Sequence, residues 1–258
     1  MDIGIIRNFV KFAIKAQAWP EHSFKLPKLQ THRGYWKSGL QENTLASLVK
    51  AKELGSKMCE FDVLLSCDGV PVLFHDDNLN RLAKRNEISR QCTSHQLQEW
   101  ANATLLEEVL TNPAVPTFLN IELKSIGADD PLERKVSELI LKHNVQNRIL
   151  FSSFNPFSIW KLSQFLPEVP RALLVCEDIE PGNNIFLRTM AMAPLLSIHL
   201  LHLDKKMISR ESMQFWKSKN MPIAAWTVND LKEMRQLEQM GVASIITDLA
   251  GPDLDITE

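Results

Sequence analysis

The sequence predicts a (β/α)8 barrel, the TIM barrel fold, from three observations. Eight short apolar segments rich in strand-forming residues recur along the chain. Helical patterns separate most of them, and several of these patterns end in glycine or asparagine, as helices commonly do. The 258 residues suit one barrel, for which about 250 residues are typical. Alternating strands and helices favour a parallel sheet, and eight strands favour a closed barrel over an open sheet.

The expected strands start after a lead-in that ends at residue 27. They are residues 28–32, 56–65, 117–123, 148–153, 171–176, 195–200, 222–228 and 244–247. The expected helices between them are residues 42–55, 130–144, 155–166, 209–220 and 230–241. Residues 70–74 follow the turn sequence CDG and are expected to form a hairpin strand on the loop after the second barrel strand. No long linker or low-complexity segment interrupts residues 28–258, so this range is expected to be one domain.

Residues 1–27 are expected to comprise an amphipathic helix and the lead-in. Arg7, Lys11 and Lys15 recur every four residues, so they form a basic stripe on a helix that carries apolar residues elsewhere. This helix either covers the closed end of the barrel or, through residues 1–19, contacts anionic lipid as an interfacial anchor. The same three cations interrupt the apolar run that a signal peptide or a membrane span requires, so secretion is not expected.

The overall composition excludes some partners. Basic residues number 29 and acidic residues 31, so nucleic acid is not an expected partner. The four cysteines show no C-x-x-C spacing and are expected to be reduced and mostly buried. We therefore expect a cytoplasmic protein, with peripheral contact to the inner face of the membrane if residues 1–19 bind lipid. The sequence does not indicate the oligomeric state.

Polar residues gather where the expected strands end. Active sites of (β/α)8 barrels form at the carboxyl ends of the strands, so these side chains are expected to converge on one mouth. They are His32, Arg33, Glu60, Asp62, Glu122, Lys124 and Trp226. His75 follows the hairpin strand and is expected to reach the same mouth. Trp226 is expected either to line the pocket wall or to pack in the core.

The three carboxylates predict a metal site. Glu60 and Asp62 are two residues apart, so they share one face of their strand, and buried like charges need a cation opposite them. With Glu122 they offer hard oxygen ligands, which suit one Mg²⁺ or Ca²⁺ ion, and the lack of histidine or cysteine among them disfavours zinc. The alternative is an ion-pair network in which Arg33 and Lys124 neutralise the acids without a metal.

The remaining polar residues favour chemistry on a phosphodiester. Arg33 and Lys124 supply two cations for an anionic group, and the planar fork of arginine suits phosphate. Cleavage of a P–O bond needs a base for the attacking hydroxyl and an acid for the leaving alcohol. His32 and His75 are the candidates, because histidine titrates near neutrality.

Seven groups of motifs resemble one family. HRG followed by ENT, then EFDV, DGVPVLFHDDNLNR, LNIELK, SSFNP, WTVN and IITD, resemble the glycerophosphodiester phosphodiesterase family in order and across nearly the whole chain after residue 30. The resemblance implies a metal-dependent TIM-barrel hydrolase that converts glycerophosphodiesters to sn-glycerol 3-phosphate and an alcohol, in lipid and glycerol metabolism. Its small-molecule substrate would be such a diester.

The resemblance also implies a role for each site residue. His32 and His75 resemble the acid/base pair, with His32 favoured as the base and His75 as the acid. Arg33 and Lys124 resemble phosphate ligands, and Glu60, Asp62 and Glu122 resemble the metal ligands. Glu42 of the ENT motif resembles a family residue near the site and is expected to orient His32 or Arg33. The choice between Mg²⁺ and Ca²⁺, and between a cyclic intermediate and direct attack by water, stays open.

The chain departs from the family pattern after the second strand. Relatives commonly carry a longer segment here, whereas residues 81–103 lead directly into TLLEEVL, and AKRNE replaces the usual TNG. This abbreviated insertion predicts a more open pocket. We expect small soluble diesters as substrates, whose alcohol (choline, ethanolamine or inositol) the sequence does not identify. The main alternative is lysophospholipase D-type cleavage of a lipid phosphodiester at a membrane surface. A catalytically silent lipid-binding barrel would predict damage at the site positions, and all of them carry suitable residues.

Overall fold

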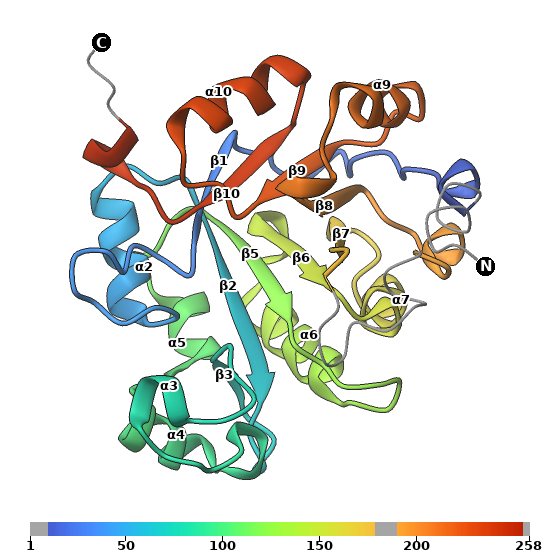
Figure 1. Ribbon diagram of the computed structural model, residues 1–258. Helices are drawn as coiled ribbons and strands as arrows, with labels where there is room; N and C mark the ends of the chain where they lie inside the picture. Colours follow the sequence, from blue (N-terminus) through green and yellow to red (C-terminus); the bar gives the residue numbers. More distant parts are fainter. Residues whose placement is uncertain (1–9, 179–189, 255–258) are drawn as a thin grey trace.

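Eight parallel strands close into a barrel in the computed structural model, which describes residues 10–178 and 190–254 (Figure 1). These strands are β1 (Leu29–His32), β2 (Met58–Leu65), β5 (Phe118–Leu123), β6 (Ile149–Ser153), β7 (Arg171–Val175), β8 (Leu200–Asp204), β9 (Ile223–Trp226) and β10 (Ser244–Thr247). The barrel closes because β1 pairs in parallel with both β2 and β10. The predicted fold class is therefore confirmed.

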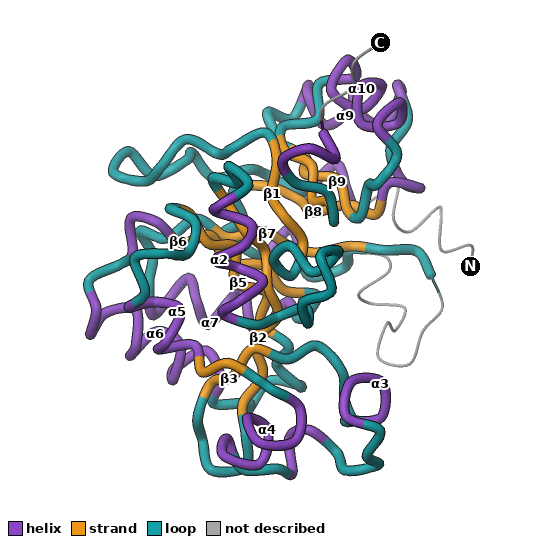
Figure 2. Tube along the Cα trace, turned by 90° about the vertical axis from the view of Figure 1, so that its left-hand side faces the viewer, coloured by secondary structure: helices purple, strands orange, loops and turns teal. Residues whose placement is uncertain are grey.

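Helices surround the barrel strands (Figure 2). They are α2 (Leu45–Glu53), α5 (Leu106–Thr111), α6 (Leu132–His143), α7 (Pro156–Phe165), α9 (Arg210–Ser218) and α10 (Leu231–Met240). Local sequence sets their ends. The side chains of Thr44 and Ser209 accept hydrogen bonds from backbone amides in the first turns of α2 and α9, and Asn144 and Gly241 end α6 and α10 in the left-handed conformation.

The barrel interior changes from apolar to charged along the strands. At the amino end lies an apolar cluster of Phe24, Met58, Leu150, Ala172, Leu200 and Ala224. Above it, Gln30 donates to Ser244 Oγ at 3.0 Å, and its own Oε1 accepts from Asn120 Nδ2 at 2.9 Å. Ser152 Oγ donates to Asn120 Oδ1 at 2.9 Å. These buried side chains satisfy one another without charge.

An insertion, residues 66–105, separates β2 from α5. It contains β3 (Pro71–Leu73), α3 (Asn80–Ala83), α4 (Ser94–Ala101) and β4 (Thr104–Leu105). β3 pairs antiparallel with β2, so the predicted hairpin strand is confirmed, and β4 pairs antiparallel with β3. Both views place β3, α3 and α4 together at one end of the molecule (Figures 1 and 2). A separate buried cluster that includes Val72, Phe74 and Leu97 gives the insertion its own core.

The sixth strand was predicted in the wrong place. It was expected at residues 195–200, whereas β8 spans Leu200–Asp204. Residues 193–195 form a 3₁₀ turn, and Ile198 makes an isolated bridge with Ala16. The run from residue 195 to residue 203 is apolar apart from one serine and two histidines, so hydrophobicity alone does not show where the strand begins. The pairing of β8 with β7 and β9 sets its position and brings Asp204 to the mouth beside Trp226.

The predicted N-terminal helix does not extend through residue 15. A 3₁₀ turn, Lys11–Ala13, ends at Ile14, which is extended, so Lys15 lies outside any helix. Arg7 and the rest of residues 1–9 lie outside the described residues. Ile14 is buried in an apolar cluster with residues of β7, β8 and β9, and Ala16 pairs with Ile198. Tertiary contacts therefore override the helical periodicity of this segment.

The lead-in covers the closed end of the barrel. Trp19 packs edge-on against Phe24, with ring centroids 5.9 Å apart, and Phe24 stacks on Phe118 at 4.4 Å. Phe24 belongs to the apolar cluster at the amino end of the strands.

Among the described residues, no helix has the length and apolar character needed to cross a bilayer.

Candidate active site

Strand register brings the predicted site residues of the barrel together. His32 lies beside Glu60 in the β1–β2 pair, and Asp62 lies beside Glu122 in the β2–β5 pair. Residues that are paired in parallel strands point to the same face, so these side chains face the barrel axis at its carboxyl end. Arg33 and Lys124 directly follow this layer.

The acid cluster consists of Glu60, Asp62 and Glu122, all buried. One carboxylate oxygen of each lies within 4.8 Å of the others. Burial and the charges of Asp62 and Glu122 raise the pKa of Glu60 well above its usual range. Burial would also raise the pKa of Asp62, but Lys124, Arg33, His75 and a hydrogen bond from Asn43 outweigh it, so that pKa lies well below the usual range. The cluster therefore holds two neighbouring acids, Glu60 and Asp62, whose pKa values are shifted in opposite directions.

Two half-buried cations face this cluster. Lys124 Nζ lies 2.8 Å from Glu122 Oε1 and 3.5 Å from Asp62 Oδ1, and Arg33 Nε lies 3.1 Å from Asp62 Oδ2. Burial alone would lower the pKa of each cation, but the facing carboxylates raise both. Within the described residues, Glu60 forms no ion pair with lysine or arginine; His32 Nε2 lies 3.9 Å from Glu60 Oε2. Among the described residues, Glu60 is thus the acid of the cluster that pairs with neither cation.

The HRG turn holds Arg33 against the second strand. Arg33 and Gly34 have φ angles of 56° and 72°. A Cβ on Gly34 would lie 2.4 Å from Ser47 Oγ and 2.6 Å from the Ser47 carbonyl carbon, so only glycine fits there. The Arg33 amide donates to the Glu60 carbonyl oxygen at 2.8 Å. Asn43 adds a second link, since its amide donates to Asp62 Oδ2 at 2.9 Å and accepts from the Asp62 N–H at 3.0 Å.

His32 is supported by residues from the last strands of the barrel. Its Nδ1 lies 2.7 Å from Asp248 Oδ1, just after β10. Asp248 Oδ2 accepts from Asn229 Nδ2 at 2.6 Å, and the Asp248 amide donates to Asn229 Oδ1 at 2.9 Å. Burial would raise the pKa of Asp248, but the bonds to His32 and Asn229 hold it below the usual range. A carboxylate at Nδ1 favours the proton on that nitrogen and leaves Nε2 facing the acid cluster.

His75 comes from the insertion and has an equivalent partner. Its Nδ1 lies 2.7 Å from Asp76 Oδ1. Its ring is close enough to Asp62 to help lower the pKa of that acid. Asp76 accepts from Arg81, which also donates to Glu42 Oε1 at 2.6 Å. Glu42 accepts from Arg33 at 2.8 Å, so of the two residues it was expected to orient, the structure places it against Arg33.

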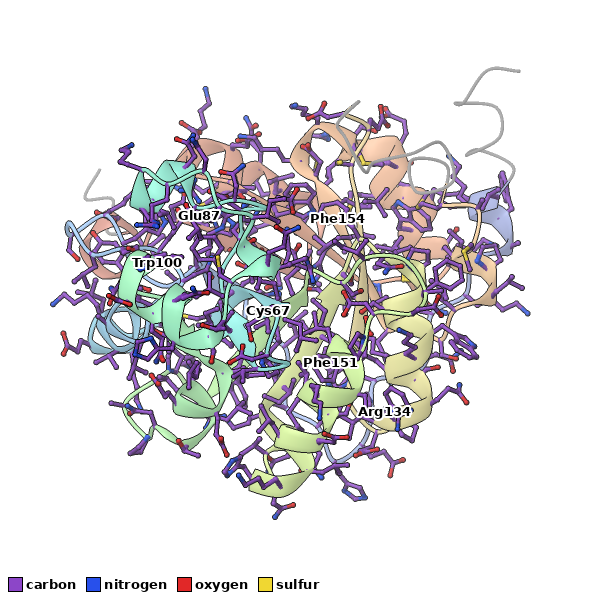
Figure 3. All side chains as sticks on the ribbon, turned by 90° about the horizontal axis from the view of Figure 1, so that it is seen from below. Cys67, Glu87, Trp100, Arg134, Phe151 and Phe154 are labelled. Carbon is purple, nitrogen blue, oxygen red and sulfur yellow. The ribbon has the colours of Figure 1, made fainter. Side chains whose placement is uncertain are left out.

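Trp226 lies on the opposite side of the mouth. Its indole N–H donates to the His202 carbonyl oxygen at 3.0 Å, and its ring meets Phe154 edge-on with centroids 5.5 Å apart. The side chain is half-buried. Figure 3 shows Phe154 among the side chains seen from below. This side of the mouth therefore carries an aromatic pair beside Asp204, whereas the β1–β2–β5 side carries the acid cluster and its two cations.

Sequence reasoning missed the residues that support the site. They are Asn43, Asp76, Arg81, Asn229 and Asp248. Each lies within one of the quoted motifs but received no role. A signal was present for two of them, because a catalytic histidine usually has a carboxylate partner, and Asp76 and Asp248 each lie next to a predicted site residue or a strand end.

Known proteins resemble this chain in sequence and structure. The model of the glycerophosphoryl diester phosphodiesterase family matches residues 32–251. The glycerophosphodiester phosphodiesterase of Caldanaerobacter subterraneus subsp. tengcongensis is 28% identical over 84% of this chain and 92% of that protein. The glycerophosphodiester phosphodiesterase of Bacillus altitudinis is 29% identical over 90% of this chain and 99% of that protein.

Two solved structures show the same likeness. A phosphodiesterase from Oleispira antarctica, in complex with the product sn-glycerol 3-phosphate, is 28% identical with a TM-score of 0.73; the match covers 86% of this chain and 93% of that one. A glycerophosphodiester phosphodiesterase from Thermotoga maritima is 25% identical with a TM-score of 0.66, over 87% and 96% of the two chains.

Proposed function

The chain belongs to the glycerophosphoryl diester phosphodiesterase family, and we propose that it hydrolyses glycerophosphodiesters to sn-glycerol 3-phosphate and an alcohol. The arrangement of one mouth carries this proposal: a buried acid cluster, two cations beside it, and two histidines that each have a carboxylate at Nδ1. The product bound to the Oleispira antarctica phosphodiesterase supports the identity of the phosphate product.

Glu60, Asp62 and Glu122 would hold one Mg²⁺ or Ca²⁺ ion. Their oxygens lie within 4.8 Å of one another, a spacing that suits ligands around one hard cation, and Glu60 is a buried acid without a lysine or arginine partner among the described residues. When bound, the ion would supply positive charge to a nonbridging phosphate oxygen.

Arg33 and Lys124 would bind the phosphate beside this cluster. Both cations are already fixed by carboxylates, Arg33 by Glu42 and Asp62, and Lys124 by Glu122. Because their positions are set before substrate arrives, they offset the charge that develops on the phosphate oxygens without reorganising.

The two histidines would transfer the protons. His32 Nε2 accepts the proton of the attacking hydroxyl, while the Nδ1–H stays bound to Asp248. His75, protonated on both nitrogens and bound to Asp76, gives its Nε2 proton to the oxygen of the leaving alcohol. If the attacking hydroxyl belongs to the glycerol moiety, a cyclic phosphate forms first, and the roles reverse when water opens it. If water attacks directly, one displacement completes the reaction.

We propose that the substrates are small soluble diesters and that the enzyme acts in the cytoplasm. One observation favours a second candidate function, cleavage of a lipid phosphodiester at a membrane surface. Phe12 is 61% exposed and Leu195 is 79% exposed, on 3₁₀ turns that contact each other. Lys219 Nζ lies 5.8 Å from the Phe12 ring centroid, and Lys11 Nζ lies 4.8 Å from the ring of Phe215 beneath it. Apolar side chains with adjacent cations suit an anionic lipid surface, where a lysophospholipid would be cleaved.

Choline release from glycerophosphocholine and from lysophosphatidylcholine tests the proposal, because both substrates share one leaving alcohol. We expect faster release from glycerophosphocholine, with equimolar sn-glycerol 3-phosphate. Strong preference for the lipid would favour cleavage at a membrane surface. Absence of release from any glycerophosphodiester by folded, metal-supplied protein would contradict the proposed function and favour a silent lipid-binding barrel.

A further inference from the structure

His75 differs from the other proposed catalytic and ligand residues in the part of the fold that carries it. The others lie on barrel strands or on the loops that directly follow them, whereas His75 lies in the insertion, after β3. The insertion pairs with the barrel sheet through β3 and β2, and the contacts of Arg90 with Asp130 and of Gln41 with Ala101 add further links. The position of His75 over the acid cluster therefore depends on how the insertion is fixed across the mouth.

Arg81, in α3 of the insertion, bridges the two parts. Its Nε donates to Asp76 Oδ2 at 2.7 Å, and its terminal NH2 donates to Asp76 Oδ1 at 3.0 Å. The same NH2 donates to Glu42 Oε1 at 2.6 Å, and Glu42 lies on the barrel loop between β1 and α2. A planar guanidinium can bind both oxygens of one carboxylate and still reach a second acid, which a lysine ammonium on one flexible stem does less well.

These contacts complete a continuous chain of alternating charges. His75 binds Asp76, Asp76 binds Arg81, Arg81 binds Glu42, and Glu42 binds Arg33. Arg33 in turn lies 3.1 Å from Asp62 in the acid cluster. His75 of the insertion and Arg33 of the barrel are thus linked by a path of three side chains, with Arg81 at its centre.

We propose that Arg81 is a positioning residue for catalysis, which orients His75 through Asp76 and fixes the insertion to the barrel through Glu42. This inference rests on the proposed function, since it requires His75 to act in the reaction.

Arg85 offers a matched comparison within the same insertion. It pairs with Glu87 at 2.5 Å and lies over the ring of Trp100 at 3.9 Å, and within the described part of the chain it forms no ion pair with Asp76 or Glu42. Figure 3 shows Glu87 and Trp100 near each other on the insertion. Arg85 thus has an ion pair and an exposure similar to those of Arg81, 40% against 47%, without contact to the proposed site. Exposed pairs of this kind usually contribute little to stability.

Arg81→Ala should lower kcat for glycerophosphocholine by about 10- to 100-fold, the scale seen when a partner that orients an active-site group is removed. Arg85→Ala should stay within about threefold of the wild type, because distant independent sites couple weakly. Arg81→Lys keeps a cation and should fall between wild type and Arg81→Ala. Melting temperatures of all variants check that each is folded.

The decisive readout is the effect of Arg81→Ala in a His75→Ala background. If Arg81 acts by orienting His75, the second substitution should change the residual rate by less than about threefold. An equal loss in both backgrounds, or a loss no larger than that of Arg85→Ala, would overturn the inference and leave the proposed function intact. A His75→Ala variant with wild-type turnover would instead overturn the acid/base assignment, and the inference with it.

Discussion

The two histidines of the mouth are supported by different regions of the molecule. His32 lies on the barrel wall, and its partner Asp248 is brought beside it when β1 pairs with β10 and the sheet closes. His75 lies in the insertion, and its partner Asp76 is the next residue in the chain, held by Arg81. Closure of the sheet thus fixes one histidine, and a local side-chain clamp fixes the other. We therefore expect substitutions that strain the barrel to cost more stability than those in the insertion, and substitutions in the clamp around His75 to act mainly on the rate.

The largest expected effect on the rate comes from replacing His32 or His75. His32→Ala and His75→Ala should each lower kcat for glycerophosphocholine by about 10² to 10⁴, the usual contribution of general acid/base catalysis. The exposed histidine His95, in α4, provides the control, and His95→Gln should leave the rate unchanged. Steady-state release of sn-glycerol 3-phosphate measures all three. Near-normal rates for both alanine variants would remove the histidine pair from the mechanism.

The next largest effect compares glycine substitutions in the barrel and in the insertion by their cost in stability. Gly34→Ala should lower the free energy of unfolding by about 2–5 kcal/mol, because the alanine would adopt a left-handed φ and also contact the Ser47 backbone. Gly69→Ala, in the insertion, also meets a positive φ but has open space around it, so about 1–2 kcal/mol is expected. Urea unfolding measures both variants. Equal losses would show that the tight HRG turn does not limit stability.

A smaller effect concerns a histidine inside the barrel. His202 is fully buried on β8, neither of its ring nitrogens has a hydrogen-bond partner among the described residues, and burial lowers its pKa to about 3. In the unfolded chain a histidine titrates near a pKa of about 6.5. Between these values the unfolded state binds more protons, so stability falls as the pH decreases below about 6.5. At pH 5 the loss from this group should be about 2 kcal/mol relative to neutral pH.

His202→Leu removes that titration and should flatten the decrease in stability between pH 7 and about pH 5. The measurement is urea unfolding at both pH values, with His95→Gln as the exposed control from the insertion. If His202→Leu and the wild type lost the same stability on acidification, His202 would not be neutral in the folded barrel.

Most of the barrel could be predicted because its strands carry clear apolar runs and polar ends. The errors arose where tertiary pairing decides. The apolar run around Ile198 contains no residue that indicates where β8 begins. Ile14 fits the helical pattern but is extended in the structure, where it is buried in an apolar cluster. The α3, α4 and β4 elements of the insertion were missed, since elements of two to eight residues carry little periodicity.

The charged residues of the site could be predicted from the sequence, but the residues that hold them in position could not. Carboxylates two residues apart on a strand indicate their shared face, and so Glu60 and Asp62 could be placed from the sequence. The partnership of His32 with Asp248 joins residues more than 200 positions apart and depends on closure of the barrel. Likewise, the link from Arg81 to Glu42 depends on how the insertion folds back, which no local pattern reports.

Removal of divalent cations tests the central claim most directly. Release of sn-glycerol 3-phosphate should disappear in EDTA and return when Mg²⁺ or Ca²⁺ is added. The returning ion should also raise the melting temperature of the wild type, because binding to the folded state stabilises it, and Glu60→Gln should weaken that rise. Full activity after complete chelation, with no metal-dependent change in melting temperature, would contradict the assignment of Glu60, Asp62 and Glu122 as a metal site.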